Sequence, residues 1–340
     1  MKTEILSLLP HEIAELMLGQ PKYRAEQIFE WLHKKNVFSF DKMLNLPKSL
    51  RDELEKSFFI TKANVIEKQI SQKDDTVKFL TQLNDAYAES VLMRYKHGNS
   101  VCISTQAGCK MGCKFCASTM NGFHRNLTAA EYCAQVYNAV PLKNIVLMGC
   151  GEPLDNFDET LRFIELITHP KGTNISGRNI TVSTCGLVPQ IYALAEKELQ
   201  ITLAISLHAP TDEIRQLFMP IAKTYPLIEL IPACRHYAEK TGRRLTFEYA
   251  LSRGFNDSPA HAKALCNLLK GILCHVNLIP INKTSDDYSP TPPRAIEIFA
   301  NILQENKIPT TIRRSLGGEI NAACGQLRSR QIIRLKTARL

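Results

Sequence analysis

The sequence predicts an α/β protein: a partial barrel of six strand-and-helix repeats, preceded by a small helical domain and a bridging β-hairpin. Two observations carry this prediction. Short apolar runs alternate with helical patterns from residue 100 onward, and the residues before them change from a helical to an alternating apolar period. Strand-then-helix repeats favour parallel strands joined by right-handed crossovers. Six repeats, fewer than the eight of a closed barrel, predict an open one.

The core of the predicted fold spans residues 96–318. The strand candidates are 100–105, 144–148, 179–183, 201–206, 245–251 and 275–280. The helical patterns are 128–140, 157–167, 187–195, a stretch within 211–238, and 259–269. The Thr-Ala-Ala-Glu sequence at 128–131 has the form of a capping box and opens the first helix. A last strand candidate follows at 310–314.

Residues 1–75 are expected to form a helical accessory domain. Apolar residues recur at helical spacing in three stretches, near residues 13–17, 23–32 and 47–54. Small helical bundles with basic edges often bind nucleic acid, although most are simply packed helices. Residues 76–95 then alternate with period two around Asn84 and Asp85, which predicts the β-hairpin.

Length and composition limit the class of protein. At 340 residues the chain is long enough for one large domain and a smaller one. No apolar run approaches the roughly 18 residues that cross a bilayer, and no export signal is evident at the start. The 11 cysteines are scattered, which favours a reducing compartment over a disulfide scaffold. We therefore expect a cytoplasmic protein with no membrane partner.

The net charge of +9 is unevenly distributed. Residues 1–95 carry 14 basic and 14 acidic side chains, which balance. From residue 313 to the end, one acidic residue, Glu319, faces seven basic ones: Arg313, Arg314, Arg328, Arg330, Arg334, Lys336 and Arg339. A basic tail on a neutral body favours a polyanionic partner such as RNA, and a solvated tail is an equal alternative.

Three cysteines lie on one short loop that contains glycine. Cys109, Cys113 and Cys116 have the spacing C-x3-C-x2-C. Three thiolates can ligate three irons of a cubane iron–sulfur cluster and leave the fourth iron without a protein ligand. An open coordination position is typical of a metal centre that performs chemistry. The alternatives are a structural zinc knuckle or three unrelated thiols, and no Cys or His at zinc-finger spacing closes such a site.

The unusual sequences lie at the ends of strand candidates, where parallel α/β folds bind ligands. Residues 148–153 (Met-Gly-Cys-Gly-Glu-Pro) follow the second strand, and Glu152 is suited to accept a hydrogen bond from an ammonium group, although a plain turn is the commoner reading. Ser183, the Ser206–His208 segment and Asn282 end later strands. A lone histidine is more often structural, but several polar endings in register favour a site.

For two residues, the residue type alone predicts an ordinary structural role. Cys324 lies among small residues at 321–327, and most lone cysteines are buried small hydrophobes. Glu89 lies in the second strand of the predicted hairpin, where an acidic residue usually faces solvent.

Together these motifs resemble the RlmN/Cfr family of radical S-adenosylmethionine (SAM) RNA methyltransferases. The matches run from Glu89 to Leu327, which is most of the chain. They include Cys102, residues 122–128 (Gly-Phe-His-Arg-Asn-Leu-Thr), 206–210 (Ser-Leu-His-Ala-Pro) and 322–327 (Ala-Ala-Cys-Gly-Gln-Leu). The resemblance implies a partial (β/α)6 radical SAM barrel. It also implies an RNA-binding role for residues 1–75 and a C-terminal loop at 319–340 that carries a methyl-carrier cysteine and the basic tail.

The resemblance assigns site residues by position. Cys109, Cys113 and Cys116 ligate a [4Fe-4S] cluster. The residues implied to bind SAM are Gly151, Glu152, Ser183, Ser206, Leu207, His208 and Asn282. The residues implied to be catalytic are Glu89 as proton acceptor, Cys324 as the S-methylcysteine intermediate, and Cys102 as the transient disulfide partner of Cys324. Cys150 and Cys185 depart from the family pattern, since each adds a thiol inside a SAM motif.

The implied reaction methylates C2 of adenosine 2503 in 23S rRNA and of adenosine 37 in tRNAs. It uses two SAM molecules per turnover, the S-methylcysteine and a 5′-deoxyadenosyl radical, with a flavodoxin- or ferredoxin-like electron donor and a monomeric enzyme. Pro153 after Glu152 favours C2 over the C8 methylation of the antibiotic-resistance branch. The alternatives are that C8 methyltransferase, a non-catalytic redox-sensing iron–sulfur RNA-binding protein, or a radical SAM enzyme acting on a small molecule or peptide.

Overall fold

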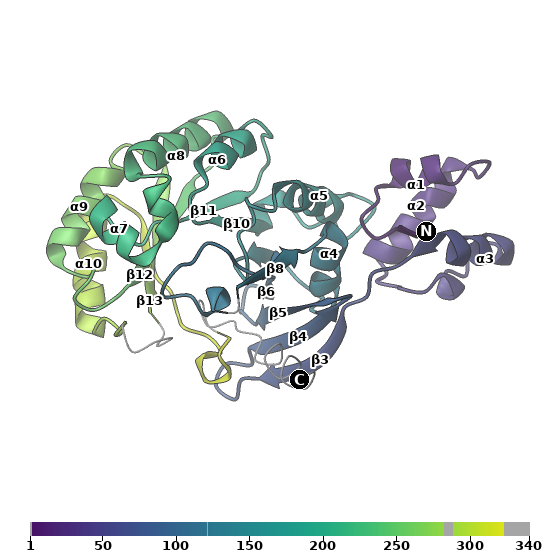
Figure 1. Ribbon diagram of the computed structural model, residues 1–340, viewed down its shortest axis with the longest axis horizontal. Coiled ribbons are helices and arrows are strands. Elements are labelled where there is room, and N and C mark those ends of the chain that lie inside the picture. The colour runs from purple at the N-terminus through teal and green to yellow at the C-terminus, as the bar shows by residue number, and fades with distance from the viewer. Residues whose placement is uncertain (1, 121, 282–287, 323–340) are drawn as a thin grey trace.

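The computed structural model describes residues 2–120, 122–281 and 288–322. Most strands in this part of the chain belong to one curved, ten-stranded sheet with the order β14-β13-β12-β11-β10-β9-β6-β5-β4-β3. Helices α5, α6, α8, α9 and α10 lie outside the curve of this sheet, and α1–α3 form a separate body beside α4 and α5, at the end of the molecule away from α9 and α10 (Figure 1). None of the described helices is long and apolar enough to cross a membrane.

The predicted partial barrel is present as the parallel part of the sheet. Its strands run in chain order from β6 to β14, each paired in parallel with the next. Their bounds are β6 Ser100–Cys102, β9 Asn144–Leu147, β10 Ile180–Thr184, β11 Thr202–Ser206, β12 Leu245–Leu251, β13 Cys274–Pro280 and β14 Thr310–Ile312. In β9 and β10 the buried apolar residues alternate with half-buried ones, so one face packs against the helices and the other faces the barrel interior, whereas Ile312 of β14 is exposed.

The crossover helices follow the sequence prediction with two additions. Their bounds are α4 Ala129–Tyr137, α5 Phe157–Thr168, α6 Val188–Ala195, α7 Asp212–Phe218, α8 Leu227–Thr241, α9 Pro259–Leu269 and α10 Pro293–Glu305. The stretch within 211–238 divides into two helices, because Pro220 and Pro226 interrupt it. The helix α10 was not predicted. The capping box of α4 is present, since Thr128 Oγ1 accepts from the backbone N–H of Glu131.

The N-terminal body contains α1 Pro10–Leu16, α2 Lys22–His33, α3 Lys48–Ser57 and a short parallel pair, β1 Thr3–Glu4 and β2 Phe58–Phe59. Two polar contacts join it to the main sheet's helices. His33 Nδ1 lies 2.6 Å from the Tyr137 hydroxyl of α4, and Arg162 of α5 forms an ion pair with Glu12 of α1 at 2.7 Å. These contacts fix the accessory body against α4 and α5.

The sequence prediction of a helical domain ending at residue 75 is wrong in its last part. Strand β3, Asn64–Ile70, pairs antiparallel with β4 Val77–Leu83, which pairs with β5 Ala86–Met93. The predicted hairpin is therefore β4–β5, and it continues the main sheet through β5 and β6. Strand β3 was missed because it is an edge strand whose apolar residues Val65, Ile66 and Ile70 are exposed, so no buried face marks its period.

A second small sheet frames the cysteine loop. Strands β7 Gln106–Gly108 and β8 Phe123–Asn126 pair antiparallel and enclose residues 109–122. A Cβ at Gly108 would lie 1.9 Å from the carbonyl oxygen of Gly122, and its φ is +83°, so this position requires glycine. The short 3₁₀ turns are η1 Phe40–Lys42, η2 Ala117–Thr119, η3 Gly177–Asn179, η4 Pro220–Lys223 and η5 Gly318–Ile320.

Candidate functional site

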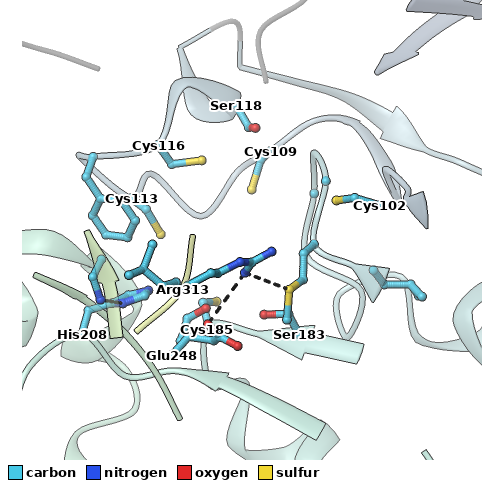
Figure 2. Close-up of a pocket in the computed structure, with 18 of the residues that line it drawn as sticks. Cys102, Cys109, Cys113, Cys116, Ser118, Ser183, Cys185, His208, Glu248 and Arg313 are labelled. Atoms are coloured by element: carbon cyan, nitrogen blue, oxygen red, sulfur yellow. Dashed lines mark hydrogen bonds and ion pairs between the residues drawn. The ribbon is translucent and has the colours of Figure 1, made fainter. Parts of the chain in front are cut away.

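A single pocket lies between the cysteine loop and the carboxyl ends of the parallel strands. Cys109, Cys113 and Cys116 all line it, and their sulfur atoms point into a common space within the curve of the loop (Figure 2). The loop is held by backbone bonds from Cys109 N to the Gly122 carbonyl at 3.1 Å and from Lys114 N to the Phe218 carbonyl at 2.9 Å. The spacing of the three cysteines thus brings all three thiols to one cavity.

The three thiols fit a cubane cluster better than a single metal ion. Within the described ranges, no three His, Cys, Asp or Glu side chains are arranged to bind one metal ion. A cubane would give each cysteine its own iron, so its three thiolates need not converge on one point as the ligands of a single ion must. Burial raises the pKa of Cys109 to about 11, assisted by Cys116 and Glu152, and burial raises the pKa of Cys113 and of Cys116. Thiols in this environment become thiolates only when a positive metal centre binds them.

The end of β9 is packed tightly against the strand that leads into the cysteine loop. A Cβ at Gly151 would lie 2.6 Å from Gln106 Cβ, and its φ is +108°. Glu152 is 4% exposed, and its carboxylate accepts from the backbone N–H of Leu154 at 3.0 Å and of Cys185 at 2.7 Å. Burial raises the pKa of Glu152, and the bonds from Cys185 oppose the rise. Glu152 therefore ties the end of β9 to the end of β10 in the pocket wall.

The ends of β10 and β11 supply polar groups to the pocket. Ser183, Thr184 and Cys185 line it at the end of β10, and Ser206 and His208 line it at the end of β11. Leu207 is fully buried, does not line the pocket, and donates its N–H to the Glu248 carbonyl at 3.1 Å. Leu207 directly follows Ser206, the last residue of β11, and its side chain leaves the chain on the opposite face, into the core.

His208 is held in a left-handed backbone conformation, with φ of +58°. Its Nδ1 accepts from the Ala250 N–H at 3.0 Å, and its carbonyl accepts from Asn256 Nδ2 at 2.7 Å. Burial lowers the pKa of His208 to about 3, and Arg215 nearby adds to this. The imidazole is therefore neutral, with its remaining proton on Nε2.

Two charged residues at the centre of the pocket were not among the predicted site residues. Glu248 of β12 is 4% exposed, accepts from Asn277 Nδ2 at 2.9 Å and lies 4.0 Å from Arg313 Nη1. The same Nη1 lies 3.9 Å from the sulfur of Met148, so Arg313 extends across the cavity (Figure 2). Arg313 was expected to belong to a basic tail, and its place in the pocket shows that this expectation is wrong for this residue. An acidic residue inside the apolar run 245–251 was the available signal for Glu248.

Cys102 and Glu89 lie beside the pocket on neighbouring strands. Cys102 of β6 lines the cavity and is opposite Val91 of β5 in the sheet register. Glu89 is 6% exposed, which contradicts the default expectation of a solvent-facing residue. It shares the pocket-facing side of β5 with Val91 and Met93, since side chains alternate along a strand.

The C-terminal segment 316–322 returns to this face of the sheet. Ala322 lines the pocket and packs with Val91 and Met93. Two other predicted residues, Cys324 and Asn282, lie outside the described residues.

Comparison with protein families identifies two matches. Residues 103–265 match the model of the radical SAM superfamily, and residues 6–60 match that of a ribosomal RNA large subunit methyltransferase N-terminal domain. The first contains the cysteine loop and the ends of β9–β12, and the second contains α1–α3.

Relatives resemble the chain over nearly its full length. The chain is 52% identical to a probable dual-specificity RNA methyltransferase RlmN of Clostridium novyi, covering 92% of this chain and 94% of the relative. It is 50% identical to the protein of the same description from Clostridium perfringens strain 13, covering 99% of each. A crystal structure of a radical SAM methyltransferase from Sphaerobacter thermophilus matches with a TM-score of 0.92 and 43% identity, covering 96% of this chain and 99% of that one. The chain therefore belongs to the RlmN family of radical SAM methyltransferases, whose cofactors are a [4Fe-4S] cluster and SAM.

Proposed function

We propose that the chain is a cytoplasmic dual-specificity RNA methyltransferase that methylates C2 of adenosine 2503 in 23S rRNA and of adenosine 37 in tRNAs. The observation that carries the proposal is the position of Ala322. This residue is two positions before Cys324 and lines the same pocket as the three cluster cysteines and Cys102. A sulfur that accepts a methyl group from SAM and passes it to RNA must reach this cavity. The printed descriptions of the relatives support the substrate class.

The residues around the pocket have two roles: some would hold the cluster and others would orient SAM. Cys109, Cys113 and Cys116 would hold the cluster, which supplies the electron that cleaves SAM to a 5′-deoxyadenosyl radical. Gly151, Glu152, Ser183, Ser206 and His208 would orient SAM, with Leu207 supporting them from the core and Asn282 contributing from the loop after β13. A neutral His208 suits a cationic ligand, because it adds no like charge.

Cys324 has the central role among the chain's own residues. Its thiolate attacks the methyl carbon of a first SAM, so that S-methylcysteine forms and S-adenosylhomocysteine leaves. Transfer of one hydrogen atom from that methyl group to the 5′-deoxyadenosyl radical lets the remaining carbon bond to adenine C2. Glu89 takes the proton that C2 gives up, and the unpaired electron of the adduct would return to the oxidised cluster. The thiolate of Cys102 then attacks the Cys324 sulfur, the carbon–sulfur bond breaks, and the released carbon takes a proton to become the methyl group of the RNA.

The disulfide left between Cys102 and Cys324 needs two electrons before the next turnover, which a thiol reductant supplies. We propose a flavodoxin- or ferredoxin-like protein as the donor to the cluster, and a monomeric enzyme. Pro153, directly after Glu152, favours C2 over C8 as the methylated position.

The decisive experiment is Cys324→Ala, with Cys266→Ala on α9 as a matched control far from the pocket. Each reconstituted protein is incubated anaerobically with SAM, reductant and either 23S rRNA or tRNA. Nucleosides are then compared by mass spectrometry with C2- and C8-methyladenosine standards. We expect the Cys324 variant to lose methylation while keeping cluster absorbance and RNA binding, and the control to form 2-methyladenosine like the parent. Methylation by the Cys324 variant at the parent rate would overturn the mechanism. A parent that binds RNA but never methylates it would favour the non-catalytic iron–sulfur protein.

A further inference from the structure

A buried lysine lies between two parts of the site that are far apart in the sequence. Lys78 of β4 is 8% exposed, and its Nζ lies 3.4 Å from Glu89 Oε1 on β5. The same Nζ donates to the backbone carbonyl of Asn321 at 3.3 Å. Asn321 is three positions before Cys324.

The pair faces the pocket side of the sheet. Lys78 is opposite Val91 in the register and Glu89 is opposite Leu80, so the two side chains are diagonal neighbours on the face that carries Val91 and Met93. The Lys78 and Glu89 side chains are only 9% and 7% exposed. An ammonium group is expensive to bury and is retained where it has partners, so this position is set by its contacts with Glu89 and Asn321.

The strand that carries Lys78, with the turn before it, also holds the rest of the C-terminal segment. Asp74 Oδ2 accepts from the Gly317 N–H at 2.9 Å, and the Ser71 hydroxyl donates to the Glu319 carboxylate. The Ala322 N–H closes the segment on the Gly317 carbonyl at 2.9 Å. Residues 71–78 thus hold residues 317–321, the segment before Cys324, through side-chain hydrogen bonds.

We propose that Lys78 is a positioning residue that couples the two halves of the reaction: its ammonium keeps Glu89 ionised and holds the Cys324-bearing segment at a fixed distance from that carboxylate. The inference rests on the proposed function, because it takes Glu89 as the base and Cys324 as the methyl carrier. Lys78 touches neither substrate nor cofactor, and acts through these two elements.

Loss of the Lys78 ammonium is expected to slow the methylation of RNA more than the methylation of Cys324. Methyl transfer from SAM to Cys324 needs no base at Glu89, whereas removal of the C2 proton does. A buried carboxylate ionises at higher pH when its neighbouring cation is lost. In the described part of the chain, the other ionisable side chains that the register and the segment bring to this face are Glu67 on β3, Tyr87 on β5, Cys102 on β6 and Glu319. Arg313 and Arg314 line the same pocket, and among the described cations Lys78 is the one within 4 Å of the Glu89 carboxylate.

The test uses Lys78→Gln, which removes the charge and keeps a hydrogen-bonding group, with Lys78→Arg as the conservative variant. The matched control is Lys68→Met, an exposed lysine on the adjacent strand β3. Two quantities are measured on the reconstituted proteins: S-methylation of Cys324 with SAM alone, by intact-protein mass spectrometry, and single-turnover formation of 2-methyladenosine from pH 6 to 9.5.

We expect Lys78→Gln to methylate Cys324 within about threefold of the parent rate and to form 2-methyladenosine at least tenfold more slowly at pH 7.5. The acidic limb of its pH profile should move up by about one unit or more, and Lys78→Arg should restore the limb to its parent position. The Lys68 control should match the parent in both assays. If Lys78→Gln does not fold, Lys78→Met, which needs no polar partner, carries the same expectations.

The inference is overturned if the neutral variant forms 2-methyladenosine at the parent rate, or if its slower turnover leaves the pH profile unmoved. Equal loss of both steps would also overturn it, since Lys78 would then act only on the fold. Failure of the proposed function looks different: the parent itself forms no methylated RNA, or Cys324→Ala remains active.

Discussion

Asn256 is the residue whose replacement tests the pocket's architecture most directly. Its side chain is fully buried and joins three backbone groups: Nδ2 donates to the carbonyls of His208 and Ala250, both at 2.7 Å, and Oδ1 accepts from the Ser252 N–H at 2.8 Å. These bonds fix the left-handed turn at His208 against the end of β12. The informative change is Asn256→Asp, which preserves size, removes the two donated hydrogens and puts an ionisable carboxyl in their place.

The cost follows from the two carbonyls left without a donor. A buried acceptor that loses its partner costs about 1–3 kcal/mol, so we expect a loss of about 2–6 kcal/mol in the free energy of unfolding at pH 8. Burial raises the pKa of a carboxyl, and a protonated carboxyl can donate one of the two bonds again. The deficit should therefore be smaller at pH 5 than at pH 8.

Urea unfolding of the parent and the variant at both pH values measures this deficit. The control is Asn301→Asp on the exposed side of α10, which makes the same chemical change without burial and should cost less than about 0.5 kcal/mol. SAM affinity, measured by equilibrium binding to the reconstituted protein, should fall with Asn256→Asp and stay unchanged with the control. A loss of less than 1 kcal/mol at pH 8 together with unchanged SAM affinity would refute the assignment of this role to Asn256.

Two further predictions concern the backbone and the accessory body. Gly151→Ala should cost at least about 2 kcal/mol more than Gly19→Ala in urea unfolding, because both glycines have positive φ but only the first would meet neighbouring atoms, at 2.6 Å, and equal costs would contradict the packing argument. Burial lowers the pKa of His33 to about 3, so the unfolded chain takes up a proton below pH 6.5 that the folded one does not. Stability is then lost as pH falls, by about 2 kcal/mol from this residue between pH 7.5 and 5.0. The difference in unfolding free energy between those pH values should be smaller by that amount in His33→Phe, and an unchanged difference would show that His33 is not the group responsible.

The repeat of strands and helices was predictable because it depends on local periodicity. The strands from β9 to β13 differ from their predicted bounds by a residue or so, since each has a buried apolar run that only a covered parallel strand needs. Strand β3 and its place in the sheet were not predictable in this way, because an exposed edge strand pairs through its backbone and leaves no periodic burial in the sequence. The domain boundary expected at residue 75 failed for this reason.

The residues of the site differ in the same way: those defined by local sequence were predictable, and those that meet across a long stretch of sequence were not. The spacing of Cys109, Cys113 and Cys116 and the polar endings of β10 and β11 are local, and those residues meet in one pocket. Leu207 was taken with its neighbours as part of one motif, whereas alternation along the chain turns its side chain into the core. Glu248 and Arg313 meet across 65 positions of sequence, so no local pattern associates them.

By itself, the sequence determined the class of fold, the cluster loop and the chemistry that a thiol-rich pocket at the strand ends can support, because spacing within a few residues decides which side chains reach the same place. Only the tertiary structure decided which distant groups share that pocket. Lys78, Glu89 and Asn321 come from two strands and the C-terminal segment, and one ammonium group joins them. Such contacts arise when the sheet curves and the chain returns across it, and their free energy depends on burial that no stretch of sequence records alone.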